Sequence, residues 1–334
     1  MRNYLLFVLR RFGQFVLVVF LGITVTFIIT HSTPIDPVEV TISAATAFGH
    51  SSPEAIELMR QSLTELYGLQ GSAWDQYVTF WGNVLRGDFG PSLSAFPTPV
   101  SELIGRALPW TVGLLATSTV LAWAIGNLLG GLAGYHRTNP WLRAAGLVAM
   151  TIQPIPYYIS AFVLLILFGY VWPIFPLTGG YQINSQTGWS LTFIGDVLWH
   201  SILPGASLVI TTIGVWFMGM RALVSNIVSE DYVVYAELGG VPSRRILWSY
   251  VMRNALTPQI TALAMSLGTI FSGAIITEQV YGYPGIGKLL IDGVNAGDYG
   301  LVLGVTAVSI IAVAGAVFIV DILYPLFDPR IRLG

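Results

Sequence analysis

One stretch of the sequence has the glycine and lysine spacing of a nucleotide-binding loop. Residues 282–289 match the pattern G-x-x-x-x-G-K, in which backbone amides and the lysine hold phosphate groups. Such a loop also needs a strand before it and a Ser or Thr directly after the lysine, to bind Mg²⁺. Here Leu289 follows Lys288, and the preceding residues belong to an apolar, membrane-type segment. We therefore expect no nucleotide site and interpret the glycines and Pro284 as a tight turn.

Residues that could support acid–base, metal or nucleophilic chemistry are few and far apart. The chain has no cysteine, which excludes disulfides and thiolate metal sites. Its four histidines are scattered: His31, His50, His136 and His200. Glu278 and Asp321 lie near the ends of apolar segments, where their carboxylates are expected to reach water or cap a loop. We predict no catalytic, cofactor-binding or metal-binding residue, and we do not expect the chain itself to be an enzyme.

The polar segment at about 223–255 carries an ordered series of helix signals. Ser229 is a candidate N-cap of a short helix, and the two acids after it, Glu230 and Asp231, suit its first turn. The pair Gly239-Gly240 is expected to end that helix, because glycine adopts the left-handed conformation at little cost.

A second, basic helix is expected to follow this glycine turn. Pro242 suits its first turn, and the helix runs past Arg244 and Arg245 towards Arg253. The result is two helices joined by a glycine turn at the membrane surface. From the residues alone, the segment is either a docking site for a partner protein or an ordinary interfacial loop.

Two prolines interrupt another apolar segment. Pro154 and Pro156 each remove a backbone donor and clash with the preceding turn, so the helix must kink or break there. Gln153, Tyr157 and Tyr158 lie beside the break. Either the break serves packing alone, or these polar side chains line a wetted transport pathway.

A later apolar segment, at about 256–280, is rich in small and hydroxyl residues. Such a helix packs tightly and can line a polar path. Its candidates for pathway lining are Ser266, Thr269 and Ser272.

Glycines also recur at a helical spacing earlier in the chain. Gly126, Gly130 and Gly134 form two overlapping GxxxG patterns, and Gly131 lies beside them. Glycines four residues apart share one helix face and allow another backbone to approach closely. This face is interpreted as packing within the chain, with contact to a second subunit as the alternative.

Composition places all these residues in a membrane protein. Of the 334 residues, 54% are hydrophobic and 10% are charged, whereas soluble domains have about 25% charged residues. The net charge of −2 gives no indication of nucleic-acid binding. We predict an all-α integral membrane protein.

Six apolar segments reach the length of about 20 residues that a membrane-spanning helix needs. They lie at roughly 10–31, 109–134, 143–172, 200–222, 256–280 and 300–325. We expect an N-terminal helix at 1–31, an extracytoplasmic segment at 32–108 with amphipathic stretches at 54–67 and 74–86, and a five-helix core at 109–334. The first apolar run exceeds the 7–15 residues of a signal-peptide core, so we expect it to stay uncleaved.

The distribution of Lys and Arg predicts the orientation, because cytoplasmic loops are enriched in both. Eleven of the 15 basic residues fall on the side of the N-terminus. Both termini and the 223–255 segment are therefore expected in the cytoplasm. The segments 32–108, 173–199 and 281–299 are expected outside, and the chain is expected to be a multi-pass protein of the cell (inner) membrane.

A series of motifs runs in order along nearly the whole chain. Its members are Arg10-Arg11 with Pro34-Ile35-Asp36-Pro37; Tyr67-Gly68-Leu69, Trp74-Asp75-Gln76-Tyr77 and Leu85-Arg86-Gly87-Asp88-Phe89-Gly90; Asp231-Tyr232, Ala236, Gly240, Arg244-Arg245, Arg253-Asn254-Ala255-Leu256 and Pro258; Gly273, Glu278, Pro284-Gly285-Ile286-Gly287 and Asp298-Tyr299; and Asp328-Pro329-Arg330. With these motifs the chain resembles a known family, the permease subunits of dipeptide/oligopeptide-type ABC importers.

The resemblance implies a mechanism and a set of partners. Two related permeases would form the pore, two cytoplasmic ATPase subunits or domains would grip their coupling loops, and an extracytoplasmic binding protein would deliver the substrate. ATP and Mg would bind to the ATPases. The implied coupling residues are Asp231, Tyr232, Ala236, Glu237, Gly240, Arg244 and Arg245. Where many ABC importers have Glu-Ala-Ala before the glycine, this chain has Val234-Tyr235-Ala236.

Other functions fit the sequence less well. A secondary transporter or channel predicts ionisable residues at mid-membrane or inverted repeats, and the sequence shows neither. A membrane-embedded enzyme predicts facing histidines and acids. Peptides are the expected substrate and oligosaccharides the alternative, with specificity resting largely on the binding protein.

Overall fold

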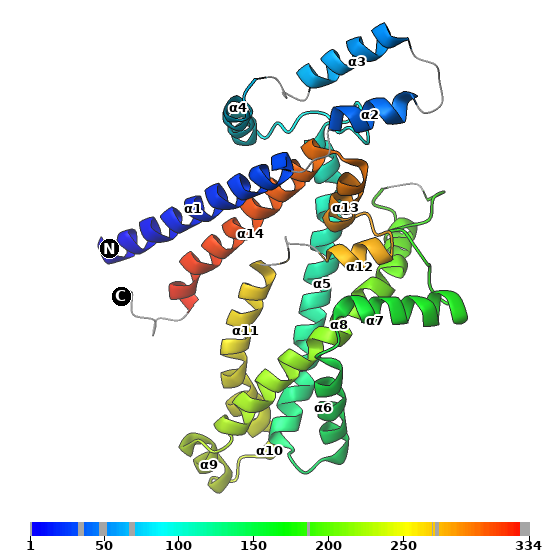
Figure 1. Cartoon of the computed structure of the whole chain (residues 1–334). Coiled ribbons are helices and arrows are strands. Elements are labelled where there is room, and N and C mark those ends of the chain that lie inside the picture. The colour runs from blue at the N-terminus through cyan, green and yellow to red at the C-terminus, as the bar shows by residue number, and fades with distance from the viewer. Residues whose placement is uncertain are drawn as a thin grey trace. The chain divides into compact units, whose positions relative to one another are not determined.

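The chain folds into helices joined by loops in the computed structural model (Figure 1). The structure describes residues 2–32, 37–46, 52–66, 71–185, 188–268, 270 and 274–327. Contacts divide the chain into two compact units. The first unit comprises Met1–Thr111, Phe271–Ile275 and Pro284–Gly334, and the second comprises Val112–Ile270 and Ile276–Tyr283.

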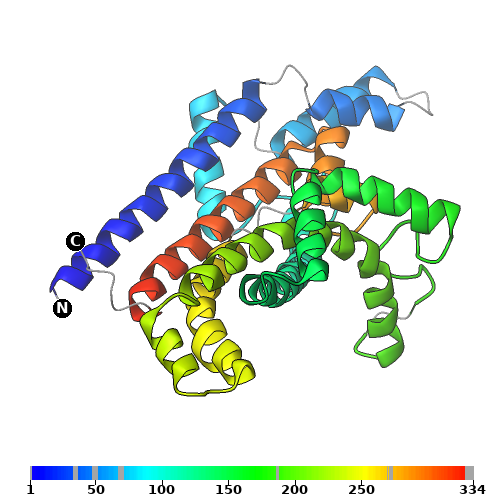
Figure 2. The same ribbon diagram turned by 90° about the horizontal axis from the view of Figure 1, so that it is seen from below.

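The first unit is built on two long helices, α1 (Arg2–Ser32) and α14 (Tyr299–Phe327). They run side by side in both views (Figures 1 and 2). Their contact is aromatic at one end, where Phe15 lies 5.6 Å from Phe318 between ring centroids. Next to these rings, Arg11 forms an ion pair of 3.3 Å with Asp321. The carboxylate of Asp321, near the end of its apolar helix, thus has a basic partner on α1.

Three shorter helices follow α1: α2 (Pro37–Thr46), α3 (Pro53–Leu66) and α4 (Ala73–Arg86). The amphipathic stretches expected at 54–67 and 74–86 are therefore helices α3 and α4. A capping box starts α4, with the Ser72 hydroxyl accepting from the Asp75 amide and the Asp75 carboxylate accepting from the Ser72 amide. The Ser72 hydroxyl and the Ser72 amide both donate to the Asp75 carboxylate, and these two bonds lower the pKa of the Asp75 carboxyl.

One buried carboxylate organises the loop after α4. Asp298, completely buried, accepts from the Ser92 hydroxyl at 2.5 Å and from the Ser94 amide at 3.0 Å. Its second oxygen accepts from the Leu301 amide in the first turn of α14, at 3.0 Å. Asp298 thereby ties a loop some 200 residues earlier in the chain to the start of α14.

The run with nucleotide-loop spacing is a turn, as expected. Gly282 has a positive φ of 55°, and α13 (Ile286–Ala296) begins four residues later, after Gly285. The Ile286 amide donates to the Thr111 hydroxyl of α5 (Val100–Tyr135) at 2.8 Å, so a side chain of this chain accepts from the amide.

The second unit centres on α8 (Leu191–Ile227), against which the glycine face of α5 (Val100–Tyr135) packs. A Cβ atom added to Gly130 would lie 2.2 Å from the carbonyl oxygen of Phe217, and one added to Gly134 would lie 2.8 Å from that of Arg221. These glycines are therefore needed for backbone approach within the chain, which confirms the packing interpretation over the subunit-contact alternative.

The proline pair breaks its helix, as predicted. α6 (Pro140–Ile152) ends just before it, and α7 (Tyr157–Leu164) begins just after it and continues into the π-helix η1 (Leu165–Val171). The two parts meet at an angle of 104°.

Within the residues that the structure describes, four helices are long and apolar enough to cross a membrane, or five if the bent pair counts as one span. The span expected at 256–280 corresponds to α11 (Arg253–Gly268) and α12 (Ile275–Val280), with residues 269 and 271–273 between them outside the described residues. The structure thus confirms a helical, multi-pass membrane protein, and the count of six spans stays a prediction.

Candidate functional site at the α9–α10 loop

The predicted short helix exists as α9 (Asp231–Leu238). Glu230 precedes it in an extended conformation, with φ −72° and ψ 142°, and makes no side-chain cap. The predicted cap by Ser229 is wrong: its hydroxyl donates to the Asn226 carbonyl at 2.8 Å. Ser229 therefore satisfies a carbonyl at the end of α8, and Asp231 occupies the first turn of α9.

The glycine pair ends α9 as predicted. Gly240 has a φ of +75°, and its amide donates to the Glu237 carbonyl at 3.0 Å. The Val241 amide donates to the Ala236 carbonyl at 3.1 Å. This pair of bonds is the Schellman arrangement, which needs a left-handed residue at the position that Gly240 occupies.

The second helix starts after Pro242, which stands just before α10 (Ser243–Arg245) and not inside it. α10 continues without a break into the π-helix η2 (Ile246–Met252) and then into α11. The Asn254 amide of α11 donates to the Tyr232 hydroxyl at 3.1 Å, so this helix also holds the start of α9.

One face of α9 is buried in an apolar cluster. Val233 is completely buried and Ala236 is 9% exposed. Their neighbours in the cluster come from α8, η2 and α11: Met220, Val224, Ile246, Leu247, Val251, Met252 and Ala255. Ala236, expected among the coupling residues, is thus an anchor of the helix and not part of its accessible surface.

The other face of α9 is open. Tyr235 is 71% exposed, Leu238 is 79% exposed, and Val234 is 40% exposed. Among the described residues, no ion pair joins the charged groups of this loop, which are Glu230, Asp231, Glu237, Arg244 and Arg245. The loop therefore combines an apolar projection with acidic and basic groups that are available to a partner.

The pathway candidates fall in two places. Gln153, Tyr157 and Tyr158 gather at the α6–α7 break, where the two tyrosine rings meet edge to face at 6.0 Å. Ser266 is half-buried on α11. Thr269 and Ser272 lie outside the described residues.

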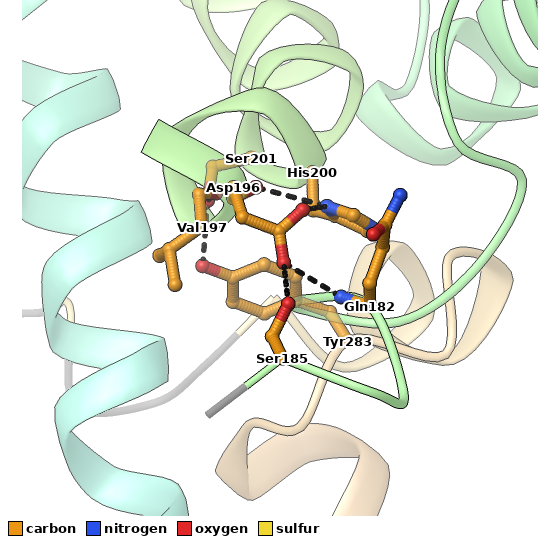
Figure 3. Close-up of polar contacts among 7 residues, drawn as sticks. All are labelled: Gln182, Ser185, Asp196, Val197, His200, Ser201 and Tyr283. Carbon is orange, nitrogen blue, oxygen red and sulfur yellow. Dashed lines mark hydrogen bonds and ion pairs between the residues drawn. The ribbon is translucent and has the colours of Figure 1, made fainter. Parts of the chain in front are cut away.

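A polar cluster that the sequence reading missed lies at the start of α8 (Figure 3). Asp196 pairs with the buried His200 one turn later, at 3.1 Å. Its second oxygen accepts from the Gln182 amide and from the Ser185 hydroxyl, each at 2.8 Å. The signal was present as an acid and a histidine four residues apart, which share one helix face.

The same cluster reaches the turn after α12. The hydroxyls of Ser201 and Tyr283 lie 2.9 Å apart, and burial raises the pKa of Tyr283, so its phenol stays protonated. The Tyr283 amide donates to the Glu278 carbonyl at 2.8 Å. Glu278 itself is completely buried, so its carboxylate does not reach water, and the expected alternative, that it caps a loop, stays a prediction.

The amino-acid sequence is similar to those of known proteins over most of its length. Residues 126–333 match the family described as binding-protein-dependent transport system inner membrane component. The chain is 30% identical over 318 residues to the oligopeptide transport system permease protein AppB of Bacillus subtilis, covering 94% of this chain and 95% of that protein. It is 31% identical over 344 residues to the dipeptide transport system permease protein DppB of Escherichia coli K12, with 98% of each chain covered.

Proposed function

Because this chain belongs to the family of binding-protein-dependent transport system inner membrane components, we propose that it is the permease subunit of an ATP-driven importer of peptides. Peptides are favoured over oligosaccharides because the relatives above are named for dipeptides and oligopeptides. No observation favours a secondary transporter or channel.

The importer is an assembly in which this chain supplies half of the pore. A second, homologous permease supplies the other half of the pore. Two cytoplasmic ATPase subunits supply the sites for ATP and Mg. An extracytoplasmic binding protein delivers the peptide. The pathway runs past Gln153, Tyr157, Tyr158 and Ser266, and Thr269 and Ser272 are further candidates for its lining that lie outside the described residues.

The proposed topology has six spans and both termini in the cytoplasm. The spans are α1, α5, the bent α6–η1 pair, α8, the α11–α12 pair and α14. The segment 32–108 is extracytoplasmic, and 109–334 is the permease core.

The α9–α10 loop is the proposed docking site for the ATPase. The observation that carries this proposal is that α9 exposes Tyr235 and Leu238 while Val233 and Ala236 fix its opposite face in the apolar cluster. Tyrosine is among the residues enriched at the energetic centres of protein interfaces, and Tyr235 is presented on a rigid support.

The test uses the absence of native cysteine. A Leu238→Cys variant, purified from its native membrane after treatment with a thiol cross-linker, should form an adduct with an ATPase subunit that carries a complete nucleotide-binding loop. Tyr170→Cys, 79% exposed on η1, is the matched control and should form none. Peptide uptake by a chain that purifies alone, without an ATPase, would refute the proposal.

A bulky residue at Gly240 provides a second test of the docking site. Gly240→Trp should abolish coupling of ATP hydrolysis to transport without preventing membrane insertion, because it distorts the turn that follows α9. Normal uptake at normal expression would exclude this loop as the docking site.

A further inference from the structure

Helix α4 is strongly amphipathic, although it lies in the segment expected outside the membrane. At 100° per residue, its apolar side chains fill one continuous arc. These are Trp74, Tyr77, Val78, Phe80, Trp81, Val84 and Leu85. The opposite arc is polar and consists of Asp75, Gln76, Thr79, Asn83 and Arg86.

Half of the apolar arc packs on α1 and α14. Trp81 stacks on Phe20 with 5.5 Å between ring centroids, and the Tyr77 hydroxyl lies 2.7 Å from that of Thr24. Val84 shares a buried cluster with Ile23 of α1 and Ala307 of α14. These contacts fix α4 against the two long apolar helices.

The other half of the arc faces away from the chain. Trp74 is 69% exposed, Val78 is 53% exposed and Leu85 is 82% exposed. These three residues form a stripe along α4, which we call the α4 stripe. Water contact along such a stripe is unfavourable by about 25 cal/mol per Å² of apolar surface.

The position of the contacts along α1 gives the depth of α4. The candidate span of α1 runs from Leu6 to Ser32, and Arg11 is the last Lys or Arg within it. At 1.5 Å per residue, Phe20 lies about 14 Å and Phe27 about 24 Å from Arg11, which is inside a hydrocarbon core about 30 Å thick. Helix α4 therefore contacts α1 at the level of the lipid tails.

The depth of α4 in the membrane can also be measured along α14, starting from the end of the bilayer opposite to Arg11. Its candidate span begins at Tyr299, and its residues in the α4 cluster are Ala307, Ile310 and Ile311. They lie about 12 to 18 Å along the helix from Tyr299. The α4 contacts thus reach from the middle of the hydrocarbon core towards the side at which α1 ends and α14 begins.

We propose that α4 is embedded in the outer leaflet of the lipid bilayer, with the α4 stripe against lipid and the polar arc towards water. Apolar side chains of α1 are exposed as well: Leu21, Val25 and Ile28 are each about half exposed. An amphipathic helix with aromatic residues suits the boundary between headgroups and acyl chains. A soluble binding protein does not enter the membrane to this depth.

The proposal goes beyond the transport function and does not depend on it. The depth follows from α1 and α14 crossing the bilayer, whatever the cargo or the ATPase partner. Only the assignment to the outer leaflet uses the proposed topology.

Site-directed spin labelling of the cysteine-free chain tests it. The single variants Val78→Cys, Leu85→Cys and Thr79→Cys are labelled in the purified transporter and placed in phosphatidylethanolamine–phosphatidylglycerol vesicles. The ratio of collisions with oxygen to collisions with a water-soluble nickel chelate should be several-fold higher at positions 78 and 85 than at position 79, the control on the polar arc of the same helix.

Two results would overturn the proposal. One is an equally low ratio at all three positions, which means that the α4 stripe is in water. The other is a low ratio at 78 and 85 that changes only when the binding protein is added, which assigns the stripe to a protein partner. Neither result bears on whether the chain transports peptides.

Discussion

Gly240 is the residue on which the shape of the proposed docking loop depends. Its backbone is left-handed, and a Cβ atom added to it would meet nothing within 4 Å. The requirement for glycine is therefore conformational and not steric. Neighbouring Gly239, with a φ of −76°, has no such requirement.

This difference predicts the effect of two similar substitutions. Gly240→Ala should cost about 1–2 kcal/mol, the price of a left-handed residue with a side chain. A cost of that size lowers the population of the correct turn about 5- to 30-fold, so uptake by reconstituted importer should fall several-fold. Gly239→Ala should stay close to wild type, and equal activity of the two variants would contradict the assigned turn.

Asp196 is the residue that holds the loop before α8. It accepts from the Gln182 amide and the Ser185 hydroxyl, and it pairs with His200 (Figure 3). Asp196→Asn removes the charge at nearly constant volume, and hydrogen bonds to a charged group are worth about 1.5–3 kcal/mol each. Hydrogen exchange of the amides at 179–185 should become markedly faster.

A surface acid provides the control for this prediction. Asp292 pairs with Lys288 one turn earlier on α13, where both side chains are partly exposed. Such pairs contribute about 0–1 kcal/mol, so Asp292→Asn should leave hydrogen exchange unchanged. Similar exchange in the wild-type and Asp196→Asn proteins would show that the Asp196 contacts do not restrain the loop.

At the scale of helices, the close approach of α5 and α8 depends on one glycine face. Gly130→Ala places a Cβ atom 2.2 Å from the Phe217 carbonyl oxygen, so one helix must move. Overpacking of this kind costs about 1–3 kcal/mol, and the thermal unfolding midpoint in detergent should fall. Gly113→Ala on the same helix meets nothing within 4 Å and should not lower the midpoint.

The sequence was sufficient for elements with a strong local signal. The prolines at 154 and 156 predicted the break between α6 and α7, and the glycine pair predicted the end of α9, because both act through backbone geometry. The π-helix η2 and the burial of Glu278 have no local signal, since they depend on packing by distant residues. The four-residue spacing of Asp196 and His200 is visible in the sequence, but the contacts of Asp196 with Gln182 and Ser185 are seen only in the structure.

At the scale of the whole molecule, the topology can be mapped because the chain has no cysteine. Ile183 is 98% exposed in the loop before α8, and Leu238 is 79% exposed on α9. Ile183→Cys should react with a membrane-impermeant thiol reagent in intact cells. Leu238→Cys should react only after the membrane is opened. The reverse pattern would invert the proposed orientation.

The anchoring of α9 has a mechanical consequence. Val233 and Ala236 are embedded among residues of α8, η2 and α11, and the Schellman turn leads directly into α10. The exposed side of α9 is therefore connected to α10 by the turn alone, without a flexible linker. A displacement of Tyr235 and Leu238 therefore moves the ends of α8 and α11 together with α9, because the three helices share one packed cluster.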